Sequence, residues 1–117
     1  MVDADSILRR LNALRDYIIK LRRFQHMTLD EIASDYMIYW AVLRGLQIAI
    51  QCIIDIASHL QSELELGVAD SYDGVLRLLG QEGILPKDFA ARISGMTGFR
   101  NILVHNYLEI DQQKVYQ

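Results

Sequence analysis

The first apolar positions of the chain recur with the period of a helix. Between Asp5 and Phe24, large aliphatic residues follow one another at steps of four, three, four and three. They are Ile7, Leu11, Leu14, Ile18 and Leu21. Side chains at these steps share one narrow stripe, which is typical of a helix packed against others in a bundle. The pattern predicts a first helix from about Asp5 to Phe24.

A second helix is expected to begin in the segment MTLDEI. Thr28 can cap its first turn, and Glu31 can reach back to the cap. Met27 and Ile32 can form the hydrophobic staple that often accompanies such a start. Because no proline occurs before Leu60, this helix could be unusually long.

The run RGLQIAIQCIIDIASHL within this second helix is apolar on nearly every side. A helix of this kind lies centrally in a bundle or is covered by a second subunit. Gly45 is its weakest point, because glycine is a poor helix former. Asp55 stands inside the run, so its carboxylate should be paired or should face a polar cleft. Asp55 and His59 are either a local polar pair on an exposed edge or two metal ligands without an evident third.

Two shorter helices are expected after a connection. The first covers about Ser71 to Gln81, and Gly83 suits its C-terminal cap. Pro86 suits the first turn of the next helix, which would run to about Asn106.

Gly95 and Gly98 lie inside this last predicted helix, where each costs about 1 kcal/mol relative to alanine. Two such costs just before Arg100 indicate a close backbone approach, a bend or a helix boundary. The pattern leaves these three alternatives open.

Together the elements predict an all-α fold, a single-domain up-and-down bundle of four to five helices over residues 1–117. A chain of 117 residues can bury one modest core but not two. With 51% hydrophobic and 23% charged residues, the composition is that of a folded protein rather than a disordered one.

The net charge of −3 provides no general attraction for nucleic acid. Residues 1–23 nevertheless carry six basic side chains against three acidic ones, a balance of +3. This segment is either a local basic face or the solvated side of an exposed helix. No secretory signal is evident, and no run reaches the roughly 18 uncharged apolar residues of a membrane span. The cytoplasm is therefore the expected compartment, with no membrane contact.

Cys52 is the single cysteine of the chain. One thiol per chain allows neither a disulfide framework nor a cysteine-based zinc site. We expect Cys52 to be a small buried hydrophobic residue.

The segment RNILVHNYLEID places an arginine and a histidine in an otherwise apolar helix. Residues seven apart nearly superimpose on a helix, so Arg100 and Tyr107 would share a stripe. His105 lies to the side, within reach of the long arginine side chain. Asn101, four residues before the histidine, could orient the imidazole ring.

Arg100 and His105 suit the cleavage of a phosphodiester. A histidine can take or give a proton near neutral pH, and a guanidinium can bind phosphate oxygens and stabilise the extra charge of the transition state. RNA carries its own attacking group, the 2′-hydroxyl, so cleavage needs a base, an acid and a cation but no metal. One chain supplies one histidine here, whereas a twofold dimer across one groove would supply both proton carriers. The structural alternative is that both side chains merely interact with the helix macrodipole.

RNILVHNY, read as Arg100-x4-His105-x-Tyr107, resembles the signature of HEPN-domain proteins, and specifically of the HepT-like branch of toxin–antitoxin systems. The run YWAVLRGLQIAIQCIIDIASHL is similar to the long central helix of that branch, and GILP and YLEID also fit. The resemblance covers most of the chain, from the first helix to Asp111. Family members usually continue into a further helix, whereas DQQKVYQ has room for about two turns, which Asp111 could cap.

The resemblance implies an all-helical protein that dimerises through its motif-bearing region and acts as a metal-independent endoribonuclease, the toxin of a type VII-like system, without a cofactor. Arg100 and His105 would be the catalytic pair, with Asn101 and Asp55 in support. Tyr107 would be the tyrosine to which a nucleotidyltransferase antitoxin attaches AMP. Its partners would be a second copy, that antitoxin and RNA. An added phosphate beside the groove would repel the RNA backbone.

Two other classes of function remain open. The chain could be a non-catalytic helical module that binds a nucleotide or a nucleotidyltransferase, with Arg100 and Tyr107 as recognition residues. The acidic net charge slightly favours this class. A four-helix metal protein is disfavoured because the sequence has no Glu-x-x-His, the spacing typical of such sites.

Overall fold

The computed structural model describes residues 4–65, 67, 71–105, 108 and 110–116. The regular structure within these residues is entirely helical, which confirms the predicted all-α class. Its elements are α1 (Ala4–Arg22), the 3₁₀ helix η1 (Arg23–His26), α2 (Leu29–Ser34), α3 (Tyr36–Glu63), α4 (Tyr72–Gln81), α5 (Lys87–Ser94), α6 (Met96–His105) and α7 (Gln112–Tyr116). The described chain has more helical segments than the four to five expected, because two of the expected helices are each divided.

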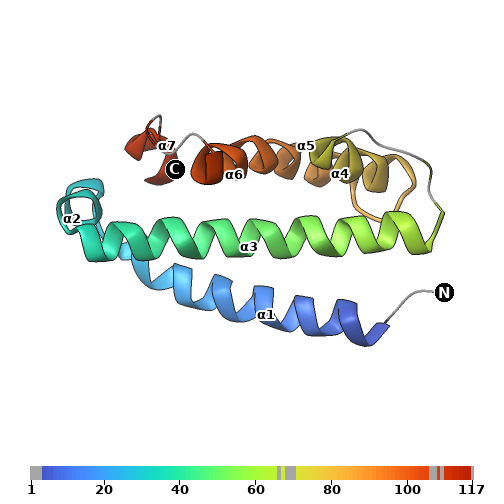
Figure 1. Cartoon of the computed structure of the whole chain (residues 1–117), viewed down its shortest axis with the longest axis horizontal. Helices are drawn as coiled ribbons and strands as arrows, with labels where there is room; N and C mark the ends of the chain where they lie inside the picture. Colours follow the sequence, from blue (N-terminus) through green and yellow to red (C-terminus); the bar gives the residue numbers. More distant parts are fainter. Residues whose placement is uncertain (1–3, 66, 68–70, 106–107, 109, 117) are drawn as a thin grey trace.

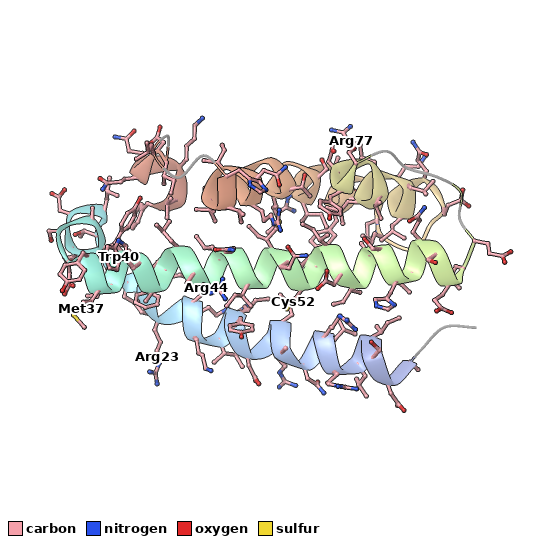
Figure 2. All side chains as sticks on the ribbon, viewed as in Figure 1. Arg23, Met37, Trp40, Arg44, Cys52 and Arg77 are labelled. Carbon is pink, nitrogen blue, oxygen red and sulfur yellow. The ribbon has the colours of Figure 1, made fainter. Side chains whose placement is uncertain are left out.

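The 28-residue helix α3 forms the middle layer of the molecule. Figure 1 shows α1 along one side of it and α4, α5 and α6 along the other, so α3 lies between two layers. The side chains of α3 reach into both layers (Figure 2). The run that is apolar on nearly every side therefore lies centrally, as predicted. The length and mean hydropathy of α3 would also suit a membrane span, but a helix covered on two opposite faces needs the same apolar character.

The expected long helix is divided at Asp35. The predicted capping box forms at its start, where the Thr28 hydroxyl accepts from the Glu31 amide and the Glu31 carboxylate accepts from the Thr28 amide, each at 3.2 Å. Asp35 then adopts extended backbone, with φ −108° and ψ 104°, so α2 ends there. Its carboxylate accepts from the amides of Met37 and Ile38 at 3.0 and 3.4 Å and caps α3. The cap explains the break, because it satisfies amides that a continuous helix would bond internally.

Two apolar clusters hold the layers together. The first joins α3 to α4 through Ala57, Val75, Leu76 and Leu79. The second joins α2, α3 and α7 through Ile32, Val42 and Val115.

The C-terminal helix α7 is fastened at both ends. Asp111 caps it, as predicted, by accepting from the amides of Gln113 and Lys114 at 2.9 and 3.4 Å. The Tyr116 hydroxyl donates to the carbonyl of Met27 at 2.8 Å. Residues Gln112–Tyr116 thus form one short helix packed against α2, and Val115 brings it into the second cluster.

Helix α1 contacts α3 through only part of its predicted stripe. An added Cβ at Gly45 would lie 2.9 Å from Leu21 Cδ2, so this glycine permits the close packing of α1 on α3. Ile7, Leu14 and Leu21 are half-buried, whereas Leu11 and Ile18 are 45% and 39% exposed. No described residue of α1 is fully buried. The spacing of apolar residues at steps of three and four predicted α1 correctly. It did not predict how much of the apolar stripe of α1 is covered by α3.

Candidate functional site

The helix that carries the arginine and the histidine begins directly after Gly95. Helix α5 ends at Ser94 and α6 starts at Met96, so the expected helix from Pro86 is divided between them. An added Cβ at Gly95 or Gly98 would meet nothing within 4 Å. Of the three alternatives for these glycines, the boundary at Gly95 is therefore observed, and close approach by another described part of the chain is not.

Arg100 projects from α6 towards α3, and the residue before it, Phe99, anchors this part of α6. Phe99 packs against the second cluster, and Arg100 follows on the half-buried edge of the same helix. Its Nε donates to Gln51 Oε1 on α3 at 3.0 Å, and its Nη1 donates to Asn101 Oδ1 at 3.1 Å. A guanidinium has five N–H donors. Among the described residues two of them are engaged, and three are left for a ligand. Asn101 therefore supports the arginine, whereas it was expected to orient the histidine.

Asp55 belongs to the same network through Gln51. The Gln51 side-chain amide donates from Nε2 to Asp55 Oδ1 at 2.9 Å. Both residues lie on α3 with a spacing of four, so they share one face of the helix. Asp55 is thus paired, as a carboxylate in an apolar run should be. Its described hydrogen bond goes to Gln51 and not to His59.

Cys52 lies beside this network, on the side of α3 that faces α1 (Figure 2). Burial raises the pKa of its thiol, the nearby charge of Asp55 raises it further, and Arg10 on α1 lowers it. Cys52 is only half-buried, so the expectation of a fully buried hydrophobic residue is wrong.

His105 is the last residue of α6, and its side chain is exposed. Within the part of the chain described here, no hydrogen bond or ion pair engages its imidazole. Arg100 and His105 therefore lie on one short helix, the first held by α3 and the second open to solvent. Tyr107 lies outside the described residues.

An open hollow of about 500 Å³ reaches Asn101 from between α3 and α4. Its wall includes Asp73, and a hydrogen bond from Ser71 lowers the pKa of that carboxyl. The hollow consequently carries a negative charge near neutral pH and does not favour phosphate. The three free donors of Arg100 are the phosphate-binding groups that the described site offers.

The described residues contain no group of three or more histidine, cysteine, aspartate or glutamate side chains that could hold a metal ion. They do supply a cation held by hydrogen bonds, the amide and carboxylate groups that support it, and a solvent-exposed imidazole five residues later on the same helix. This set can bind a phosphate and transfer a proton.

Gln51 is the member of the site that sequence reasoning missed. Its spacing of four from Asp55 was available as a signal. Its contact with Arg100, 49 residues away in sequence, depends on how α6 packs against α3 and has no local signature.

Over residues 14–117 the sequence matches the family described as Ribonuclease HepT-like. A tRNA nuclease HepT of Aphanizomenon flos-aquae is 33% identical over 107 residues, which are 92% of this chain and 73% of that protein. An mRNA nuclease HepT of Shewanella oneidensis is 28% identical over 109 residues, covering 92% of this chain and 80% of that protein.

Solved structures share the fold. A tri-AMPylated Shewanella oneidensis HEPN toxin in complex with an MNT antitoxin superposes with a TM-score of 0.83 at 25% identity, covering 98% of this chain and 84% of that one. A chain from a toxin–antitoxin crystal structure with AMP-PNP superposes with a TM-score of 0.84 at 24% identity, covering 95% and 83%. The family match spans most of the sequence and is supported by both nuclease relatives. The chain therefore belongs to the HepT-like ribonuclease family.

Proposed function

We propose that this chain is the toxin of a type VII-like toxin–antitoxin system and cleaves RNA without a metal ion, using Arg100 and His105. The observation that carries the proposal is the contrast between these two side chains on α6. Arg100 is held by Gln51 and Asn101 with donors to spare, and His105 is exposed five residues later. Phosphodiester transfer requires a positioned cation and a proton carrier that the substrate can reach.

The proposed reaction is an internal transfer at phosphorus. His105 takes the proton of the 2′-hydroxyl, and the 2′-oxygen attacks the adjacent phosphate. Arg100 binds the non-bridging oxygens, where negative charge accumulates. The bond to the 5′-oxygen breaks and that oxygen receives a proton from a second imidazole. The products are a 2′,3′-cyclic phosphate and a 5′-hydroxyl, so no water is consumed.

The second imidazole is proposed to come from another copy of the chain. Each chain has one histidine at the site, and a twofold pair of α6 helices would bring two histidines and two arginines to one groove. Exposure of His105 and of Asn101 on α6 supports this arrangement, because both would be available to such a groove.

A nucleotidyltransferase antitoxin is the proposed partner, as in the HEPN toxin–MNT complex named above. The Tyr107 hydroxyl would attack the α-phosphorus of ATP, so that AMP becomes attached to the tyrosine and pyrophosphate leaves. The attached phosphate would stand two residues from His105 and repel an RNA phosphate. The proposed location is the cytoplasm, because AMPylation needs ATP, cleavage needs RNA, and both occur there.

The proposal is tested by incubating the purified protein with RNA in the presence of EDTA. Wild-type protein should leave cyclic phosphate ends, and RNA with 2′-O-methyl groups should resist. His105→Ala should lower the cleavage rate by about 10²- to 10⁴-fold, the usual contribution of a general acid–base group. Arg100→Ala should lower it by about 10²-fold or more, because the transition-state charge loses its main partner.

The matched controls are His26→Ala, an exposed histidine at the end of η1, and Arg77→Ala, an exposed arginine on α4 (Figure 2). Both should cleave like wild type, and circular dichroism should show all four variants fully helical. If His105→Ala degraded RNA at the wild-type rate, the assignment of His105 would be rejected. Binding of a nucleotidyltransferase without any cleavage would favour the non-catalytic module instead.

A further inference from the structure

Gln51 stands between the carboxylate of Asp55 and the guanidinium of Arg100. It donates from Nε2 to Asp55 Oδ1 at 2.9 Å and accepts at Oε1 from Arg100 Nε at 3.0 Å. The three side chains are half-buried and come from two helices that pack together, α3 and α6. Both ends of the glutamine amide are therefore engaged.

This network has only one workable direction. A carboxylate accepts hydrogen bonds and cannot donate them, so Asp55 requires the NH₂ side of the Gln51 amide. The carbonyl side is then turned to Arg100, whose guanidinium can only donate. With the amide rotated by half a turn, donor would face donor at Arg100 and acceptor would face acceptor at Asp55. Asp55 thus favours the orientation in which the oxygen of the Gln51 amide, and not its nitrogen, points to the arginine.

The support of Arg100 is a neutral group, and its neutrality matters for the charge of the site. A carboxylate bonded directly to the guanidinium would compensate the positive charge that a phosphate must meet. The Gln51 amide holds Nε without reducing the positive charge of the guanidinium. The carboxylate of Asp55 is kept away from Arg100, because the Gln51 side chain lies between them. Because Asn101 holds Nη1 as well, the outer end of the guanidinium is oriented before any ligand arrives.

We infer that Gln51 is a positioning residue for Arg100, and that Asp55 acts on the arginine only by orienting the amide of Gln51. This inference rests on the proposed function of Arg100 as the phosphate-binding group. It predicts that the phosphate is met by the outer Nη donors, since Nε is already taken.

The test compares four variants on one RNA substrate. Gln51→Leu replaces the amide by an apolar side chain that is one atom shorter and removes both hydrogen bonds. It should lower kcat/KM by about 10- to 100-fold, the usual effect of losing a hydrogen bond to a charged group. Gln51→Glu keeps an acceptor for Nε but adds a negative charge, and it should raise KM for RNA. Asp55→Leu should resemble Gln51→Leu, whereas Asp55→Asn, which keeps an acceptor for the Gln51 amide, should restore most of the activity.

The double variant Gln51→Leu/Asp55→Leu distinguishes this network from two separate contributions. If Asp55 acts only through Gln51, the double variant should be no slower than Gln51→Leu alone. If the losses in kcat/KM of the two single variants multiply in the double variant, the proposal that Asp55 acts only through Gln51 is overturned. Gln81→Leu at the exposed end of α4 makes the same substitution away from the site and should leave cleavage unchanged.

A second measurement does not depend on activity. The Nε–H of Arg100, observed by ¹⁵N NMR, should exchange slowly with water in the wild type and in Asp55→Asn. It should exchange faster in Gln51→Leu, where the acceptor is gone. If Gln51→Leu fails to fold, Asp55→Leu carries the same comparison with Gln51 in place.

The two proposals can fail separately. If Arg100→Ala abolishes cleavage but Gln51→Leu has wild-type kcat/KM and unchanged Nε–H exchange, the positioning role is overturned and the nuclease assignment stands. If wild-type protein does not cleave RNA, the nuclease assignment falls, and the exchange of Nε–H still decides whether Gln51 holds the arginine.

Discussion

At the scale of single residues, the two proposed catalytic side chains differ in the number of hydrogen bonds that they make to other described residues. Arg100 has two hydrogen bonds to neighbouring side chains, whereas His105 is exposed at the end of its helix. A phosphate ligand needs a cation in a fixed place, because an ordered guanidinium loses less rotational freedom on binding. A proton carrier must reach an oxygen of the bound RNA, so the exposure of His105 suits its proposed task.

The thiol of Cys52 provides a pH-dependent prediction. Burial and the charge of Asp55 both disfavour the thiolate, so the pKa of Cys52 is raised above its ordinary value. Since the thiolate is the reactive form, alkylation by iodoacetamide should accelerate only at higher pH than in an unfolded peptide with the same local sequence. Mass spectrometry of the labelled fraction against pH measures the midpoint.

Asp55→Asn is the matched control for this titration. Removing the carboxylate charge leaves burial in place and should move the midpoint of Cys52 alkylation down, towards but not below that of the peptide. A wild-type midpoint at or below the peptide value would contradict the electrostatic environment described for Cys52.

At the scale of helices, the sequence predicted the capped ends better than the breaks. Thr28 and Asp111 cap helices as expected, because the side chain of each bonds amides within its own segment. The break at Asp35 was not predicted, and the break at Gly95 was one of three alternatives that the pattern left open. A single aspartate or glycine costs a helix little, and the separation of the helices on either side is decided by what they pack against.

Close packing of α4 on α5 depends on Gly80. A Cβ added there would lie 2.7 Å from the Cβ of Ala90, an atom that cannot move without its backbone. Alanine favours a helix by about 1 kcal/mol over glycine, but overpacking costs about 1–3 kcal/mol. Gly80→Ala should therefore lower the free energy of unfolding by up to about 2 kcal/mol, seen as a lower urea midpoint.

Gly98→Ala serves as the comparison, because its new methyl group would meet no other atom within 4 Å. There only the gain in helix propensity applies, and the urea midpoint should rise or stay level. A stabilised Gly80→Ala protein would show that α4 and α5 separate freely, contrary to the packing described.

At the scale of the whole molecule, the arrangement of layers followed from the sequence but the contacts across them did not. The run around Ile50 and Ile54 is apolar on all sides, and both residues are buried in the central helix. The pairing of Gln51 with Arg100 required the register of α6 on α3, which no local pattern specifies. The roles of Asn101 and Asp55 at the site stay predictions, and only the folded chain shows that Asn101 bonds the arginine directly and Asp55 through Gln51.

The proposed shared groove predicts how activity depends on the mixing of subunits. Wild-type and His105→Ala chains are refolded together in equal amounts, and native mass spectrometry confirms random pairing. If both imidazoles are needed, mixed pairs are inactive and about a quarter of the wild-type activity remains, as twofold pairing dictates. If each chain acts alone, half of the activity remains.

Mixing with His26→Ala is the control for this experiment and should leave the activity unchanged. A linear decline with the fraction of His105→Ala would argue against a shared groove while leaving the role of His105 intact.

The distance in sequence between Gln51 and Arg100 has a consequence for protein synthesis. The glutamine leaves the ribosome 49 residues before the arginine that it holds. Until α6 has emerged and packed against α3, a nascent chain has no oriented guanidinium and no histidine beside it. Interrupted translation products are therefore expected to be harmless to the cell's own transcripts, and only chains synthesised through α6 require an antidote.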